Sequence, residues 1–122
     1  MPTQENQKNM EKFNNILNLP ITLGSTIQEY HQLFETKILP FFHNFRPDLL
    51  VISAGYDANQ ADLLSQINLQ PQDYIALTQY SLEITPRVLF GLEGGYELDS
   101  LSISVLETIR QCLNGSNTQY NI

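Results

Sequence analysis

Two apolar runs dominate the hydrophobic pattern of this chain, and each one ends in small and polar residues. Residues 49–53 lead into a turn that carries Asp57, and residues 87–92 lead into a Gly-Gly turn followed by Tyr96. Unbroken runs of Leu, Val and Ile are typical of strands buried on both faces of a parallel sheet. Because ligands of open α/β sheets bind at the carboxyl ends of the strands, the pattern predicts that both side chains lie at one rim.

Helical spacing of apolar residues marks three further segments. Residues 27–45 show it, with Ser25 or Thr26 as the N-cap, and Pro40 is expected to kink or divide that helix. A second helix is expected to open at Pro71 and to end at residues 85–86. Its expected inner side comprises Tyr74, Leu77, Ser81 and Leu82. The apolar stripe of a final helix comprises Leu98, Leu101, Val105, Ile109 and Cys112, with Asn114-Gly115 as its C-cap.

The remaining segments are predicted to be loops and chain termini. Residues 15–21 are expected to form a short edge strand, and residues 58–69 a loop with one helical turn. Residues 1–12 are predicted to be a disordered tail, 13–114 one α/β domain and 115–122 a C-terminal tail. The order of elements predicts parallel pairing through right-handed crossovers. Two or three such strands need neighbours at both edges, so the chain reads as part of a larger sheet.

Composition narrows the classes of partner. Thirteen acidic residues against six scattered basic ones give a net charge of −7, which argues against direct binding of nucleic acid. The one cysteine, Cys112, excludes an intrachain disulfide and is expected to be a buried, inert thiol. The sequence shows no apolar run long enough to span a membrane and no signal peptide, so a cytoplasmic location is expected.

The candidate chemical residues are ambiguous when each is taken alone. Asp57 could be a metal ligand, a helix cap or a solvated acid, and Tyr96 could be a rim aromatic or a hydrogen-bond donor. Gly94 and Gly95 would allow a ligand to approach the backbone closely. A generic nucleotide-binding domain is disfavoured, because the turn lacks the G-x-G-x-x-G pattern and no Walker-type lysine is present.

Taken together, the two motifs resemble a known family. FRPDLLVISAGYDANQAD, followed some thirty residues later by RVLFGLEGGYELDSL, resembles the C-terminal part of the zinc-dependent histone deacetylases. That family includes acetylpolyamine amidohydrolases and acetoin-utilisation proteins. The resemblance implies part of a three-layer α/β/α sandwich with a mostly parallel sheet (arginase/deacetylase-like), without its N-terminal strands.

The resemblance also implies roles for individual residues. Asp57 matches a ligand of the catalytic zinc, and Tyr96 matches the tyrosine that stabilises the tetrahedral oxyanion. Gly94 and Gly95 match glycines that line the pocket for the acylated amine. Asn59 departs from a histidine often found in relatives, so the conformation of this loop is an open question. Leu63, where relatives usually have proline, departs in the same loop.

Other parts of the family site have no counterpart in this sequence. The family's Asp-x-His ligand pair and His-His base pair are absent, and the two histidines, His31 and His43, are expected to be structural or exposed. Three origins are open: a truncated gene, a fragment, or a split gene whose upstream deacetylase-family partner completes the site. If completed, the site would hydrolyse N-acetyl-lysine or acetylpolyamine amides. The alternative is a non-catalytic interaction module, so whether the chain is an enzyme stays open.

Overall fold

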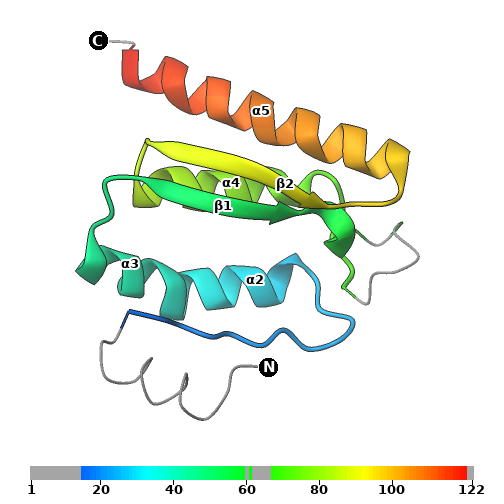
Figure 1. The fold of residues 1–122 in the computed structure, drawn as a ribbon, viewed down its shortest axis with the longest axis horizontal. Coiled ribbons are helices and arrows are strands. Elements are labelled where there is room, and N and C mark those ends of the chain that lie inside the picture. Colours follow the sequence, from blue (N-terminus) through cyan, green and yellow to red (C-terminus); the bar gives the residue numbers. More distant parts are fainter. Residues whose placement is uncertain (1–14, 60, 62–66, 121–122) are drawn as a thin grey trace.

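The computed structural model describes the backbone of residues 15–59, 61 and 67–120, and side chains as far as Asn114. In this part of the chain, a helical segment precedes strand β1, helix α4, strand β2 and helix α5 (Figure 1). The tail predicted at residues 1–12 lies outside the described residues. No helix in the described part has the length and apolar character that a membrane crossing requires.

The two apolar runs form a parallel pair of strands, as predicted. β1 comprises Leu50–Gly55 and β2 comprises Val88–Gly94. The pairing is regular until it skips Glu93, so that Gly55 lies opposite Gly94. Such a bulge bends a strand and redirects the chain beyond it. The two glycines therefore lie side by side at the carboxyl ends of the strands, next to the turns that carry the candidate site.

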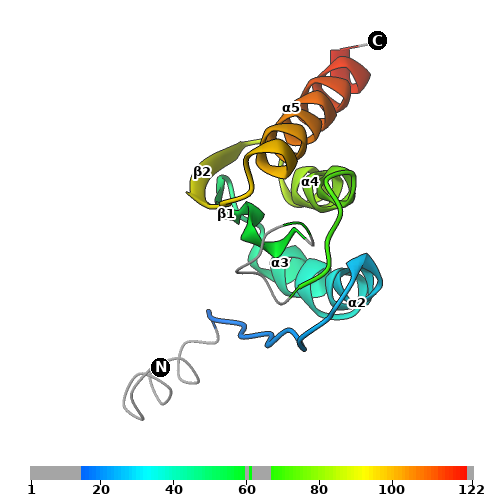
Figure 2. The same cartoon turned by 90° about the vertical axis from the view of Figure 1, so that its right-hand side faces the viewer.

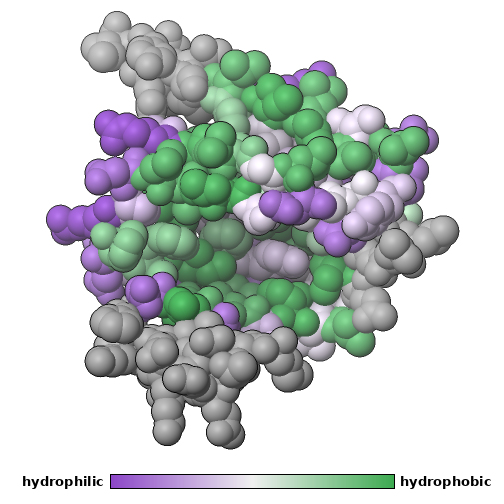
Figure 3. All heavy atoms as spheres, in the orientation of Figure 1, coloured by the Kyte–Doolittle hydropathy of each residue, from purple (hydrophilic) through white to green (hydrophobic). Residues whose placement is uncertain are grey.

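In the part of the chain that the structure describes, helices cover one face of this sheet and leave the other bare. α4 (Asp73–Ile84) and α5 (Leu98–Tyr120) pack against each other and lie over that face, whereas α2 and α3 run beside the free edge of β1 (Figures 1 and 2). On the other face, the paired side chains of Val51 and Leu89 are 62% and 58% exposed. Figure 3 shows hydrophobic residues gathered over the middle of this side of the molecule. The described residues thus build two layers of an α/β/α sandwich, and within them the second face of the sheet stays exposed.

The first helical segment is divided at Pro40, as expected. α2 (Ile27–Leu33) begins at a capping box formed by Thr26 and Glu29, and a π-helical turn follows at residues 34–38. The wider turn accommodates the proline, whose ring would clash with a carbonyl of the preceding turn in a regular α-helix. α3 (Leu39–Phe45) then carries Pro40 in its first turn, where no N–H is needed.

Two expectations about the ends of the domain are wrong. Residues 15–22 are irregular, so the short strand predicted at residues 15–21 does not form. Pro20 offers no N–H to a partner strand, and no strand in the described part lies beside this segment to pair with it. α5 continues past the expected C-cap at Gly115 as far as Tyr120. A helical glycine costs only about 1 kcal/mol relative to alanine, which the neighbouring turns can outweigh.

The loop predicted at residues 58–69 is described only at its two ends. A single 3-10 turn spans Tyr56–Ala58, and Asn59 then forms an isolated parallel bridge with Leu69. The bridge draws the two ends of the loop together beside the carboxyl end of β1. Leu63, which departs from the family pattern, lies outside the described residues.

The buried side of α5 also differs from the predicted apolar stripe. Leu98 and Ile109 are 73% and 51% exposed, whereas Ser100, Ser104 and Thr108 are buried. These three small polar residues recur every fourth position and therefore share one face of the helix. Small side chains allow α5 to approach its neighbours closely. Within the predicted stripe, Leu101 and Val105 are half-buried and pack against the core, so the stripe is correct in part. On α4, the predicted inner residues Tyr74 and Ser81 are buried, while Leu77 and Leu82 are half-buried.

The hydrophobic core of the described residues is small. Three hydrophobic residues are buried, Tyr56, Leu69 and Tyr74, whereas fourteen large hydrophobic side chains are exposed. A chain that folds alone buries most of its large apolar side chains, and large exposed apolar patches mark surfaces that contact something else. The small core therefore supports the expectation, drawn from the sequence, that this sheet belongs to a larger one.

Candidate active site

Asp57 lies in the 3-10 turn Tyr56–Ala58, directly after β1. This residue is exposed, yet its carboxylate reaches back over the ends of both strands. A Cβ atom built on Gly94 would lie 3.1 Å from the Asp57 carboxyl carbon, and one built on Gly55 would lie 2.8 Å from Oδ1. Both positions are therefore occupied by glycine where the carboxylate needs room. The structure therefore places the Asp57 carboxylate against Gly94 at the carboxyl ends of the two strands.

Tyr96 follows in the loop that joins β2 to α5. Gly95 has a φ of +135°, and a Cβ there would lie 2.9 Å from Leu101 Cδ1 and 3.1 Å from Tyr56 Cβ. Glycine is thus required both by backbone conformation and by space. Tyr96 is 64% exposed, and the carboxylate of Glu97 accepts the backbone N–H of Ser100 at 2.7 Å to cap α5. The loop therefore holds Tyr96 at the rim that also carries Asp57.

Two phenols lie near the carboxylate of Asp57. The Tyr74 hydroxyl donates to the Gly55 carbonyl at 3.5 Å. Burial, and then the charges of Tyr30 and Asp57, raise the pKa of Tyr74. Burial, and then the charge of Asp57, raise the pKa of Tyr30 as well. Both phenols stay protonated at neutral pH, so they line the carboxylate with neutral groups rather than with a second charge.

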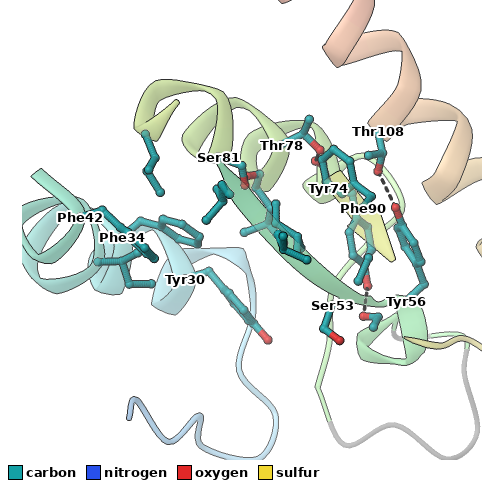
Figure 4. Close-up of a pocket in the computed structure, with 18 residues that line it drawn as sticks. Tyr30, Phe34, Phe42, Ser53, Tyr56, Tyr74, Thr78, Ser81, Phe90 and Thr108 are labelled. Atoms are coloured by element: carbon teal, nitrogen blue, oxygen red, sulfur yellow. Dashed lines mark hydrogen bonds between the residues drawn. The ribbon is translucent and has the colours of Figure 1, made fainter. Parts of the chain in front are cut away.

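A cavity of about 350 Å³ opens beside these phenols, between the helices and β1. Figure 4 shows aromatic side chains around it: Tyr30 from α2, Phe34 from the π-helical turn, Phe42 from α3 and Tyr74 from α4. The lining is mostly apolar, with a few Ser, Thr and Tyr hydroxyl groups. A cavity next to an unpaired strand edge is typical of an incompletely filled core, and we assign it no ligand.

The turn that carries Asp57 is tied to α5 by buried polar side chains, which the sequence pattern did not indicate. The Tyr56 hydroxyl and Thr108 Oγ1 are hydrogen-bonded at 2.9 Å (Figure 4). The Asn59 carboxamide, which is 0% exposed, donates to the Tyr56 carbonyl at 2.9 Å and to Ser104 Oγ at 3.0 Å. The four-residue spacing of serine and threonine along residues 100–108 could have predicted this contact. Such polar residues on a helix are usually assumed to face solvent.

The metal-binding capacity of the described residues is limited. They contain no group of three His, Cys, Asp or Glu side chains that could hold a metal ion. His31 Nδ1 is hydrogen-bonded to the Tyr80 hydroxyl at 2.7 Å, and His43 is exposed, so both are structural or exposed as predicted. A catalytic zinc takes three protein ligands and keeps one open position. Among the described residues, Asp57 is not part of such a three-ligand group.

Cys112 is half-buried on α5, and burial raises the pKa of its thiol. A raised thiol pKa lowers the fraction of reactive thiolate. The sequence predicted a buried, inert thiol; Cys112 is only half-buried, and its raised pKa agrees in direction with low reactivity.

Comparison with known proteins decides the family. The sequence profile of the histone deacetylase domain matches residues 2–112. The chain belongs to the histone deacetylase family. The resemblance drawn from the two motifs is thereby confirmed, and the α/β fold with a parallel sheet agrees with it.

Individual relatives show how much of the family domain is present. The chain is 50% identical over 99 residues to the Synechocystis protein slr0245, covering 81% of this chain and 33% of that protein. It is 37% identical over 102 residues to histone deacetylase 14, chloroplastic, of Arabidopsis thaliana, covering 80% of this chain and 24% of that protein. The chain therefore spans a third or less of the length of these relatives.

Solved structures of histone deacetylases share the fold of this chain. The histone deacetylase Clr3, from Schizosaccharomyces pombe, superposes with a TM-score of 0.72 at 34% identity, covering 76% of this chain and 16% of Clr3. The HDA15 HD domain gives the same TM-score and identity over 75% of this chain and 26% of that domain. The partial deacetylase fold is thus confirmed. The roles assigned to Asp57, Gly94, Gly95 and Tyr96 stay predictions.

Proposed function

We propose that this chain supplies the C-terminal part of a zinc-dependent deacetylase site. In this proposal Asp57 gives one carboxylate ligand to zinc, and Gly94 and Gly95 border the pocket for an acylated amine. The phenol of Tyr96 donates a hydrogen bond to the carbonyl oxygen that becomes negative during amide hydrolysis. Such a preorganised donor typically contributes ~10²–10³ in rate. The observation that carries the proposal is the carboxylate of Asp57 held against Gly94 at the ends of two parallel strands.

The remaining ligands and the general base come, in this proposal, from a deacetylase-family segment outside this chain. The bare sheet face, with Val51 and Leu89 exposed, offers the surface on which that segment would pack. So do the outer edges of β1 and β2, which pair with no further strand among the described residues. Strand edges with free N–H and C=O groups pair readily with further strands. The chain by itself is therefore expected to bind no stoichiometric zinc and to release no acetate.

The substrate class proposed is an N-acetylated amine, either acetyl-lysine or an acetylpolyamine. The relatives named as histone deacetylases support the first, and the polyamine deacetylase HDAC10 of Danio rerio, 32% identical over 99 residues, supports the second. Both substrates present the same acetamide on a narrow alkyl chain.

A chimera tests the proposal. The segment of Arabidopsis histone deacetylase 14 that matches this chain is replaced by this chain's residues, and zinc content and acetate release are measured with an acetyl-lysine peptide and with acetylspermidine. The chimera is expected to bind one zinc and to release acetate. A folded chimera, with the parent's circular dichroism and thermal midpoint but neither zinc nor acetate release, contradicts the proposal.

Substitutions in the chimera separate the two roles. Asp57→Asn is expected to abolish stoichiometric zinc binding, whereas Tyr96→Phe keeps the zinc and lowers kcat by ~10²–10³. Asp99→Asn and Tyr80→Phe are matched controls, because they make the same chemical changes in the first turn of α5 and beside His31. Equal effects of the site and control substitutions would exclude these roles.

A non-catalytic interaction module is the second candidate, and the absence of a three-ligand metal group among the described residues favours it. The two candidates differ in the response to Asp57→Ala. If the chain is a non-catalytic module, Asp57→Ala leaves partner binding unchanged, and the complex shows no deacetylation with or without the substitution. If the chain is half of an enzyme, Asp57→Ala leaves partner binding unchanged but abolishes deacetylation by the complex.

A further inference from the structure

The short turn that carries Asp57 is fastened to α5 on both sides of the aspartate. On one side, the Tyr56 hydroxyl is hydrogen-bonded to Thr108 Oγ1 at 2.9 Å. On the other side, the Asn59 carboxamide nitrogen donates to Ser104 Oγ at 3.0 Å. The aspartate lies between these two attachments, so its backbone can turn only if one of them breaks.

Asn59 also closes the turn on itself. Its carboxamide nitrogen donates to the Tyr56 carbonyl at 2.9 Å, and its backbone N–H reaches the same carbonyl at 3.3 Å. A single side chain therefore joins the beginning of the turn, its end and the helix. Only a carboxamide supplies two N–H donors from a side chain this short.

The Asn59 side chain is fully enclosed by its surroundings. Asn59 and Ser104 are both 0% exposed, and Leu69, 1% exposed, bridges to the backbone beside them. The Leu69 N–H donates to the Ala58 carbonyl at 3.0 Å. Fully buried hydrogen bonds persist because a buried polar group that loses its partner is left desolvated.

α5 also lies close to the loop that carries Tyr96, the second candidate site residue. α5 starts two residues after Tyr96, and a Cβ built on Gly95 would lie 3.1 Å from Tyr56 Cβ and 2.9 Å from Leu101 Cδ1, so the Gly95 loop lies close to both the turn and the helix. Both Asp57 and Tyr96 are thus positioned relative to one rigid helix. The contact of Asn59 with Ser104 sets where the aspartate lies on it.

We propose that Asn59 is a positioning residue for the deacetylase reaction: through the Tyr56 carbonyl and Ser104, its carboxamide fixes the turn at residues 56–58 on α5 and sets the direction of the Asp57 carboxylate. The role rests on the proposed function. Asn59 is buried beneath the turn and makes no contact with the substrate. It acts through Asp57, as outer residues orient the ligands of metal sites.

The variants that test the proposal are Asn59→Ala, Asn59→Asp and Ser104→Ala. Asn59→Asp keeps the size and can accept from Ser104, but it cannot donate to the Tyr56 carbonyl. Ser104→Ala removes only the attachment to the helix and is the mildest change. Ser81→Ala is the matched control, because it removes a buried hydroxyl hydrogen bond to the Leu77 carbonyl within α4.

The first measurement uses the whole 122-residue chain and needs no metal. Backbone ¹⁵N order parameters of residues 57 and 58 are expected near ~0.85 in the unsubstituted chain and below ~0.6 in Asn59→Ala and Asn59→Asp. Ser81→Ala is expected to leave them unchanged. In a double-mutant cycle, Ser104→Ala is expected to have no further effect once Asn59 is alanine.

The second measurement uses the deacetylase chimera. Asn59→Ala is expected to weaken zinc binding by ~10–100-fold, as is typical when an orienting partner of a metal ligand is lost. Ser81→Ala should lower the thermal midpoint similarly without changing zinc affinity, which separates positioning from general stability. If the unsubstituted chimera binds no zinc, the proposed function fails, and the order parameters still test Asn59. Unchanged order parameters in Asn59→Asp and Ser104→Ala overturn the positioning role.

Discussion

Gly94→Ala is the substitution that tests the geometry of the candidate site most directly. The added methyl carbon would lie 3.1 Å from the Asp57 carboxyl carbon, 3.2 Å from Oδ2 and 3.3 Å from Oδ1. These distances are shorter than ordinary van der Waals contact, so the carboxylate has to move by a few tenths of an ångström. Because Asp57 is exposed, its carboxylate can move aside into solvent, so we expect the protein to keep its fold.

The consequence for a metal ligand is larger than the consequence for stability. Metal sites accept ligand distances only within about 0.2 Å of the preferred value. We therefore expect Gly94→Ala to weaken zinc binding by the chimera ~10–100-fold, the range seen when a ligand loses its orientation. The thermal midpoint should change little, because β2 otherwise keeps its hydrogen bonds.

Two other glycines serve as controls. A Cβ at Gly91 would lie 3.8 Å from the Ile52 carbonyl oxygen, which is an ordinary contact, so Gly91→Ala should change neither property. At Gly95, a positive φ costs alanine about 1–3 kcal/mol. The 2.9 Å overlap with Leu101 adds about 1–3 kcal/mol. Gly95→Ala should therefore lower the free energy of unfolding markedly.

The assay is zinc titration of the three chimera variants, with thermal unfolding monitored by circular dichroism. The expected pattern is loss of affinity at position 94, loss of stability at position 95 and neither at position 91. Zinc affinities of Gly94→Ala and Gly91→Ala within twofold of each other would refute the placement of Asp57 as a zinc ligand against Gly94.

Two further predictions concern the exposed sheet face and the first helix. Val51→Lys should change the free energy of unfolding of the isolated chain by no more than about 0.5 kcal/mol, because Val51 is 62% exposed there. In the chimera, the same substitution should prevent soluble assembly, which size-exclusion chromatography would show. A fully soluble, zinc-loaded chimera would contradict the proposed packing on this sheet face. The Thr26 backbone N–H lowers the pKa of Glu29 below its ordinary value of 4.5, so this contact stabilises the fold above that pH and the contribution is lost as the pH falls through the lowered pKa. The free energy of unfolding, measured with urea, should therefore fall less between pH 7 and pH 3 in Glu29→Gln than in the unsubstituted chain. The same pH dependence in both proteins would exclude this contribution.

The parts of the fold that the sequence predicted correctly depend on local chemistry. The two apolar runs became a parallel pair of strands, and Pro40 divided the first helical segment because its ring is incompatible with a continuous α-helix. The turns that carry Asp57 and Tyr96 followed from glycines and strand ends. These features need only short stretches of chain to be recognised.

The parts that the sequence did not predict depend on the residues that lie opposite one another after folding. The buried side of α5 carries Ser104 and Thr108, whereas Ile109 of the predicted apolar stripe is exposed and lines a hollow beside Leu92 of β2. Asn59 read as a departure from the family pattern, yet it is the most deeply buried side chain of the turn.

The sequence by itself determined the family, the parallel strand pair and the identity of the residues at the rim. Only the tertiary structure showed that the Asp57 carboxylate needs the space left by Gly94, and that Asn59 and Tyr56 fasten its turn to α5. The physical reason is that a motif records which side chains succeed one another, whereas hydrogen bonds such as that between Asn59 and Ser104 join residues 45 positions apart. Their partners become known only when strand and helix are packed together.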